Sequence, residues 1–136
     1  MKKIFIATLI VTITLFAKSA EYDGLMADLS KQAKSQSPSF VGFSKERGEK
    51  LFFAVQKDKN NQPISCATCH QNDIRQKGKN PTTGKIIEPL APSVNNMRLT
   101  DRAEMEKWLK RNFKQVYGRE GTAMEKGDVL EFISNK

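Results

Sequence analysis

The sequence has very few residues of the kinds that most often bind metals or form covalent links. Only two cysteines and one histidine occur among 136 residues. A structural zinc site usually takes four Cys or His ligands, so this chain alone does not supply one. A redox-active thiol pair of the thioredoxin type sits in an alternating pattern of strands and helices, and no such pattern is visible.

The chain also lacks internal repeats, low-complexity segments and blocks of like charge. Its 23 basic and 15 acidic residues give a net charge of +8, and the two signs are interleaved along the chain. Interleaved charges argue against nucleic-acid binding. A mildly basic surface of this kind can still steer an acidic protein partner.

The one long apolar run lies at the N-terminus and is too short for a comfortable membrane helix, which needs about 20 residues. It follows Lys2 and Lys3 and ends in small residues. This order is typical of a secretory signal peptide, here over residues 1–20. We therefore expect an exported, periplasmic protein with one domain, residues 21–136, and no stable membrane span. An uncleaved N-terminal anchor is the alternative.

Apolar residues at helical spacing predict an all-α fold of short helices. We expect helices over residues 21–36, 44–55 and 100–112, and a last helix that starts at Thr122. Ser44, Asp101 and Thr122 are suited to cap the last three of these helices. In the second helix, Leu51, Phe52 and Val55 form one apolar side, and Gly48 on that side predicts a closely packed partner.

Residues 71–98 are polar and rich in turn signals. So long an irregular segment is unusual in a small domain unless something organises it. A bound cofactor would do so.

Both cysteines and the histidine fall in one stretch, SCATCHQND, at residues 65–73. Two thiols spaced like Cys66 and Cys69 can add to the two vinyl groups of one haem, and the adjacent His70 can then bind the iron from one side. A structural disulfide is possible in an exported protein. It would leave the histidine and the long loop unexplained, so the motif predicts one covalent haem c.

The ligand on the other side of the iron cannot be a second histidine of this chain. Met97 lies in a predicted loop but only 27 residues after His70, which is short for a methionine ligand. Met105 shares an apolar helix face with Trp108, and core packing is the simpler interpretation. Asn112 continues that face by one turn. It is either a residue at the end of a helix or a ligand through its amide oxygen, and spacing alone favours the first.

Longer motifs carry a family resemblance. From residue 47 to residue 133 the chain resembles the sphaeroides haem protein family of monohaem cytochromes c. The matching pieces are ERGEKLF, SCATCHQNDIRQKG, TTGKIIEPLAPS, RLTDRAEMEKWLKRN and EKGDVLEF. The third and fourth pieces are more specific than the haem motif itself.

The resemblance implies a small class I cytochrome c-like fold, in which helices around Gly48 and Phe132 cross. It also implies that His70 and Asn112 bind the ferric iron and that Asn112 leaves on reduction. The ferrous haem would then be open to small diatomic molecules such as oxygen and nitric oxide. The implied electron donor is a dihaem or multihaem cytochrome c.

Three further residues are expected at the haem. Trp108 and Leu90 are expected to contact it. Pro89 is expected to begin a wall beneath His70, where a carbonyl of residues 89–92 accepts the free imidazole N–H.

The chain departs from the family pattern at two positions. Phe113 and Gly121 stand where the family has a pair of cysteines, so the corresponding disulfide cannot form here. We expect Phe113 to pack near the haem edge instead. Met97 replaces a polar residue, which keeps the methionine-ligand alternative open.

Three functions therefore compete: a ligand-binding electron-transfer protein, an ordinary His/Met electron carrier, and an enzyme that reduces a bound small molecule. No distal general acid is evident for the third function. Lys110 and Arg111, which flank Asn112, are the nearest candidates for proton or anion contacts.

Overall fold

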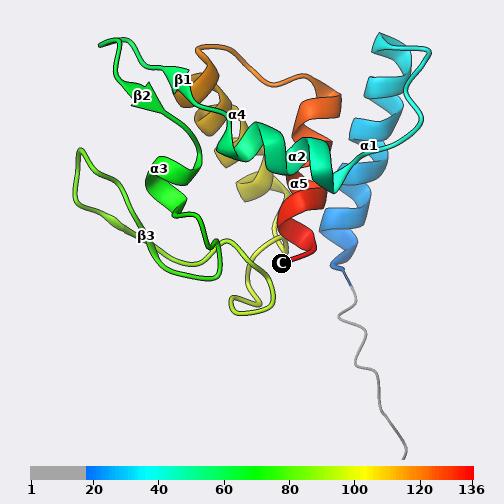
Figure 1. The fold of residues 1–136 in the computed structure, drawn as a ribbon. Helices are drawn as coiled ribbons and strands as arrows, with labels where there is room; N and C mark the ends of the chain where they lie inside the picture. The colour runs from blue at the N-terminus through cyan, green and yellow to red at the C-terminus, as the bar shows by residue number, and fades with distance from the viewer. Residues whose placement is uncertain (1–17) are drawn as a thin grey trace, which may run out of the picture.

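The computed structural model describes residues 18–136, in which short helices and very short strands follow one another (Figure 1). The helices are α1 (Ala20–Gln36), α2 (Lys45–Phe53), α3 (Ala67–His70), α4 (Arg102–Tyr117) and α5 (Ala123–Ser134). The strands are β1 (Gln56–Lys57), β2 (Pro63–Ile64), β3 (Gly78–Lys79) and β4 (Ile86–Ile87). β1 pairs with β2 and β3 with β4, both antiparallel. These two-residue ladders were not predicted, since they are too short to show alternation.

The predicted caps are present. Ser44 accepts a hydrogen bond from the Arg47 amide, and Asp101 accepts one from the Glu104 amide. Thr122 and Glu125 form a reciprocal capping box at the start of α5. These short side chains satisfy amide groups that have no partner within the first turn.

The C-terminal ends differ from the prediction. Helix α2 ends at Phe53, and Val55 lies beyond it with 67% of its surface exposed, so its assignment to the apolar side is wrong. Helix α4 continues past Asn112 to Tyr117. It ends there because Gly118 takes a left-handed conformation, with φ at 69°, that turns the chain out of the helix.

Helices α2 and α5 cross in close contact, as expected. A Cβ at Gly48 would overlap the backbone carbonyl of Asp128 and lie 2.9 Å from the Cβ of Phe132. The rings of Phe52 and Phe132 lie 5.4 Å apart, centroid to centroid. The missing side chain at Gly48 is therefore what allows the two backbones to approach.

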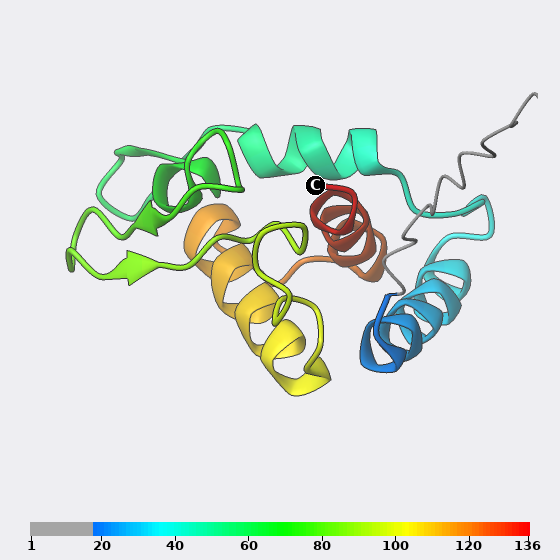
Figure 2. The same cartoon turned by 90° about the horizontal axis from the view of Figure 1, so that it is seen from below.

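Helix α5 is central in the described part of the chain, because α1 and α2 both pack against it (Figure 2). The buried apolar residues form one core that draws on all the longer helices and on the segment before α4. Its largest fully buried side chains are Phe52, Met105, Leu109, Leu130 and Ile133. Met105 is thus a core residue, as its spacing predicted.

Between α2 and α4 the only helix is the single turn of α3. This segment carries both strand pairs and lies beside α4 (Figures 1 and 2). Strand β3 passes directly under α3, since a Cβ at Gly78 would overlap the carbonyl of Cys69. Residues 71–98, predicted to be irregular, contain only the two-residue strands β3 and β4, and the cysteine–histidine motif comes directly before them.

The predicted signal peptide, residues 1–20, lies outside the described residues except for its last three. Ser19 caps α1 by accepting a hydrogen bond from the Tyr22 amide, so the predicted cleavage near Ala20 falls in the first turn of this helix. Among residues 18–136, no helix has the length and apolar character needed to cross a membrane.

Candidate haem site

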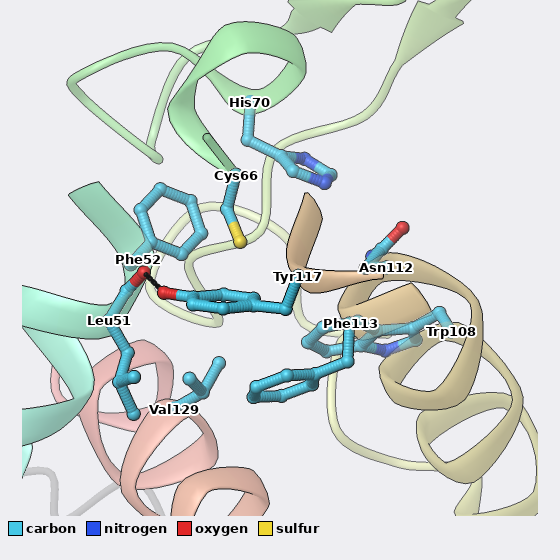
Figure 3. Close-up of a pocket in the computed structure, with 9 residues that line it drawn as sticks. All are labelled: Leu51, Phe52, Cys66, His70, Trp108, Asn112, Phe113, Tyr117 and Val129. Atoms are coloured by element: carbon cyan, nitrogen blue, oxygen red, sulfur yellow. Dashed lines mark hydrogen bonds between the residues drawn. The ribbon is translucent and has the colours of Figure 1, made fainter. Parts of the chain in front are cut away.

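The cysteine–histidine motif forms the single turn of α3. Cys66 is the residue before the helix, and Cys69 and His70 lie in it. Residues three apart on a helical turn share a side, so the two thiols are presented together. Gln71 ends the turn with φ at 69°. Figure 3 shows the His70 ring pointing away from α3 toward α4.

Helix α4 supplies the opposite side of the site. Trp108 and Asn112 are four residues apart and therefore lie on one face. In Figure 3 the Asn112 amide lies across from the His70 ring, with the Trp108 indole one turn below it. Among the nine residues drawn there, the one side-chain hydrogen bond joins Tyr117 to Leu51, and none involves the side chain of His70 or Asn112.

Two cavities meet at these side chains. The inner cavity is almost entirely apolar and is lined by Leu51, Phe52, Cys66, His70, Trp108, Asn112, Phe113, Tyr117 and Val129. The outer cavity has a volume of about 480 Å³. Its lining includes Cys69, Leu90, Arg98 and Arg111 as well as His70, Trp108 and Asn112. His70, Trp108 and Asn112 line both cavities, so the two are parts of one cleft between α3 and α4.

The electrostatics of the cleft keep the imidazole neutral. Burial, together with the positive charges of Arg98 and Arg111, lowers the pKa of His70 to about 4. A neutral imidazole is the form that binds a metal. The ring is therefore ready to act as a ligand at neutral pH without losing a proton first.

Two arginines at the outer cavity have no carboxylate partner in the described part of the chain. Arg98 is half-buried, and its guanidinium donates to the carbonyls of Glu88 and Pro89, both at 2.8 Å. The ion pairs found over residues 18–136 involve other basic residues. Burial lowers the pKa of Arg98, so this charge lies where an anion would stabilise it.

No disulfide joins Cys66 and Cys69. Burial raises the pKa of Cys66 to about 11, and it also raises the pKa of Cys69. Within residues 18–136, no three His, Cys, Asp or Glu side chains gather as a metal site. The motif therefore offers two thiols and one imidazole, and nothing in the described residues completes a zinc centre around them.

These features fit a haem. The cleft has an apolar inner part and an outer cavity of about 480 Å³; Cys66 lines the inner part and Cys69 lines the outer cavity. His70 and Asn112 place a nitrogen donor and an oxygen donor on opposite sides, and neither is used in a bond to the other residues of the inner cavity. The unpaired Arg98 and Arg111 match the two carboxylates that a haem carries.

The structure places the other predicted site residues as follows. Leu90 lines the outer cavity, whereas Pro89 lines neither cavity. The Pro89 carbonyl accepts from Asn95 Nδ2 at 3.0 Å and from Arg98 Nε at 2.8 Å, and the expectation that a carbonyl of residues 89–92 accepts from His70 stays a prediction. Met97 is 73% exposed and lines neither cavity.

Sequence reasoning missed several residues of the cleft. Tyr117 was overlooked because the helix was expected to end at Asn112, although it lies four residues after Phe113 and continues the same face. No sequence pattern around Arg98 indicated that it would line the cleft. Phe113 does line the inner cavity, as expected for a residue near the haem edge.

Comparisons with known proteins agree with this geometry. Residues 38–133 match a family described as a domain of unknown function (DUF1924). The chain is 45% identical over 89 residues to the cytochrome c-type protein SHP of Cereibacter sphaeroides, covering 65% of this chain and 68% of that protein.

Solved structures give the same result. The structure of oxidised SHP, described as an oxygen-binding cytochrome c, matches with a TM-score of 0.74 and 36% identity, covering 88% of this chain and 100% of that one. Oxidised cytochrome c'' from Methylophilus methylotrophus matches with a TM-score of 0.78 and 28% identity, covering 85% and 94%. A solution structure of that cytochrome c'', described as giving insights into haem-ligand detachment, has a TM-score of 0.74 and 29% identity, covering 85% and 93%.

The helix-rich fold predicted from the sequence is confirmed by these matches. The family match covers residues 38–133, more than half of the chain, and SHP is 45% identical over 89 residues. The chain therefore belongs to the sphaeroides haem protein family of c-type cytochromes.

Proposed function

We propose that this chain is an exported electron-transfer protein with one covalent haem and a second axial position that opens on reduction. In this proposal Cys66 and Cys69 hold the haem and His70 binds the iron permanently. Asn112 binds the oxidised iron and leaves the reduced iron, which frees that position for a small diatomic ligand such as oxygen or nitric oxide. The observation that carries the proposal is the placement of His70 and Asn112 on opposite sides of one cleft, which both line.

The methionines of the described residues support this choice by their positions. Met97 is 73% exposed, Met124 is 37% exposed, and Met105 is buried in the core at 1%. Neither these three nor Met26, the fourth methionine of residues 18–136, is among the residues that line the cleft. For Met97 to reach the iron, the loop that carries it would have to leave its present position, whereas Asn112 already lies in the cleft.

The donor chemistry favours a switch. A haem supplies an iron that changes between two oxidation states and accepts one axial ligand on each side. The amide oxygen of Asn112 is a hard, neutral donor, which suits the ferric state better than the ferrous state. Methionine sulfur has the opposite preference. We therefore expect Asn112 to hold its position when the protein is oxidised and to release it when the protein is reduced.

The relatives support the same interpretation. One is described as an oxygen-binding cytochrome c, and the solution structure of another concerns the detachment of a haem ligand. We propose a redox partner of the dihaem or multihaem cytochrome c type and a periplasmic location, both of which follow from the family resemblance and the N-terminal sequence.

The test is a matched pair of variants, Asn112→Ala and Met97→Ala, each purified with its haem attached. We expect Asn112→Ala to change the absorption and electron paramagnetic resonance spectra of the oxidised protein, because an axial ligand is lost. We expect Met97→Ala to match the wild type. The proposal fails if Met97→Ala changes the oxidised spectrum and Asn112→Ala does not.

A further inference from the structure

Asn112 lies in the second half of α4, and its side chain has no hydrogen bond to the other residues of the inner cavity. Its place in the cleft therefore depends on what holds the last turns of α4. Four residues gather there: Leu51, Phe113, Tyr117 and Gly121, which we call the Tyr117 cluster. Leu51, Phe113 and Tyr117 also line the inner cavity.

The ring of Phe113 packs against the backbone at Gly121, which has no side chain. Phe113 is 5% exposed, and a Cβ at Gly121 would lie 2.8–2.9 Å from three atoms of the ring. Any side chain at residue 121 would therefore push the ring, because such contacts are shorter than van der Waals distance. The pair fixes the loop after α4 against the residue that directly follows Asn112.

Tyr117 joins the same end of α4 to a distant helix. Its ring lies 5.4 Å from that of Phe113, with 31° between the ring planes. Its hydroxyl donates to the carbonyl of Leu51 at 2.6 Å, across 66 residues of sequence. That carbonyl lies in the last turn of α2, where carbonyls have no partner within the helix. The hydroxyl therefore satisfies a group that α2 itself leaves unpaired.

The helix held in this way also contacts the other side of the cleft. Phe52, the neighbour of Leu51, has its ring 6.1 Å from the ring of His70. A chain of contacts thus runs from His70 through Phe52 and α2 to Tyr117, and from Tyr117 along α4 to Asn112. It joins the two expected ligands by a route that does not cross the cleft.

We propose that Tyr117, supported by the packing of Phe113 on Gly121, is a positioning residue that sets the place of Asn112 relative to His70. This proposal rests on the function proposed above, because it presumes that Asn112 binds the oxidised iron. In this protein, the packing of Phe113 and Tyr117 restrains the end of α4, as a covalent link between the same segments would.

The hydroxyl is suited to this role. Burial is the main reason that the pKa of Tyr117 is raised to about 12. The hydroxyl therefore keeps its proton and remains a donor to Leu51 over the whole range in which the protein would work.

The test compares Tyr117→Phe with Tyr22→Phe, since the chain has two tyrosines. Tyr22 is buried in α1, and its hydroxyl bonds to Glu131 and Ser134 at 3.2 and 3.1 Å, outside both cavities of the cleft. Each variant loses one buried hydroxyl, so both are expected to lower the stability to a similar extent.

Only Tyr117→Phe is expected to change the haem site. In the oxidised protein it should shift the ratio of Asn112-bound to Asn112-free forms about fivefold toward the free form, the size expected for one ordinary hydrogen bond. Absorption and electron paramagnetic resonance spectra measure this ratio. If Tyr117→Phe does not fold, Phe113→Leu provides the second measurement, because it removes the ring face that covers Gly121.

Two results would overturn the proposal. One is a wild-type oxidised spectrum in Tyr117→Phe or Phe113→Leu. The other is an equal spectral change in Tyr22→Phe, which would show that general destabilisation is the cause. Failure of the proposed function is recognised separately, since in that case Asn112→Ala itself leaves the oxidised spectrum unchanged.

Discussion

The crossing of α2 and α5 and the cleft between α3 and α4 are built in different ways. At the crossing, the buried carboxylate of Asp128 accepts from the Ser44 amide at 2.7 Å and from Arg47 at 2.7 and 2.8 Å. In the cleft, the His70 ring and the Asn112 amide face each other with no bond to the residues around them, and Arg98 has no carboxylate partner among the described residues.

The difference shows which parts of the chain are complete by themselves. Buried polar groups are costly unless they are paired. The crossing meets that requirement with its own residues. In the cleft, no buried side-chain atom of the described residues lacks a partner, but the polar ends of His70 and Asn112 face open space that a bound group can fill. We infer that the first region determines the fold, whereas the second depends on the haem for its order.

The largest expected effect comes from removing the covalent attachment. In Cys66→Ser/Cys69→Ser we expect no covalently bound haem, and a loss of stability on the order of 3 kcal/mol or more, because a tightly held group no longer favours the folded state. The loss should be uneven along the chain. Hydrogen exchange should speed up most in residues 54–101, and least in α2 and α5. An equal loss of hydrogen-exchange protection in both regions would contradict the proposed difference between the crossing and the cleft.

The crossing itself is tested by an added methyl group. Gly48→Ala should lower the free energy of unfolding by about 3 kcal/mol, since the new Cβ would overlap the Asp128 carbonyl and overpacking is costly. The matched control is Gly24→Ala in α1, where the nearest atom is an Arg102 nitrogen at 4.0 Å. It should be neutral or stabilising by up to about 1 kcal/mol. Thermal unfolding of the haem-loaded protein measures both variants, and equal effects would contradict the packing described here.

The smallest expected effect concerns acid. The guanidinium of Arg119 and the Thr122 amide lower the pKa of Glu125 below its usual value of 4.5. A depressed carboxyl pKa stabilises the fold above the usual pKa, and this contribution is lost as the pH falls through the lowered value. Glu125→Gln should therefore cost about 0.5–1 kcal/mol at pH 7, reduced by exposure of the pair, and the difference from wild type should shrink below pH 4.5.

The control for that change is Glu104→Gln, an exposed residue of α4 with one surface partner, Lys107. Stability curves against pH in urea would compare the two variants. A constant difference between Glu125→Gln and wild type from pH 7 to pH 3 would show that the carboxylate charge of Glu125 is not what stabilises α5.

The sequence was most informative where the signal is local. Ser44, Asp101 and Thr122 cap the helices as predicted, because a cap depends on the next few residues only. The CxxCH motif identified the cysteines and His70 for the same reason. Gly48 was found through its place on an apolar helix face.

What was missed depends on contacts between distant residues. The hydrogen bond from Tyr117 to Leu51 joins residues 66 apart in the sequence, and no local sequence pattern near either residue predicts it. The hydrogen bonds from Asn95 and Arg98 to the Pro89 carbonyl come from a turn that cannot be read from spacing. Asn112 was the borderline case. Its helical position was predictable, but its relation to His70 needed either the family resemblance or the structure.

The most direct test of the central claim is the optical spectrum of the reduced wild-type protein, recorded with and without carbon monoxide. If Asn112 leaves the reduced iron, the ferrous protein should be high-spin and should bind carbon monoxide at once. A low-spin ferrous spectrum with slow or no binding, together with the sulfur-to-iron band at the red edge of the oxidised spectrum, would mean methionine ligation and would contradict the account.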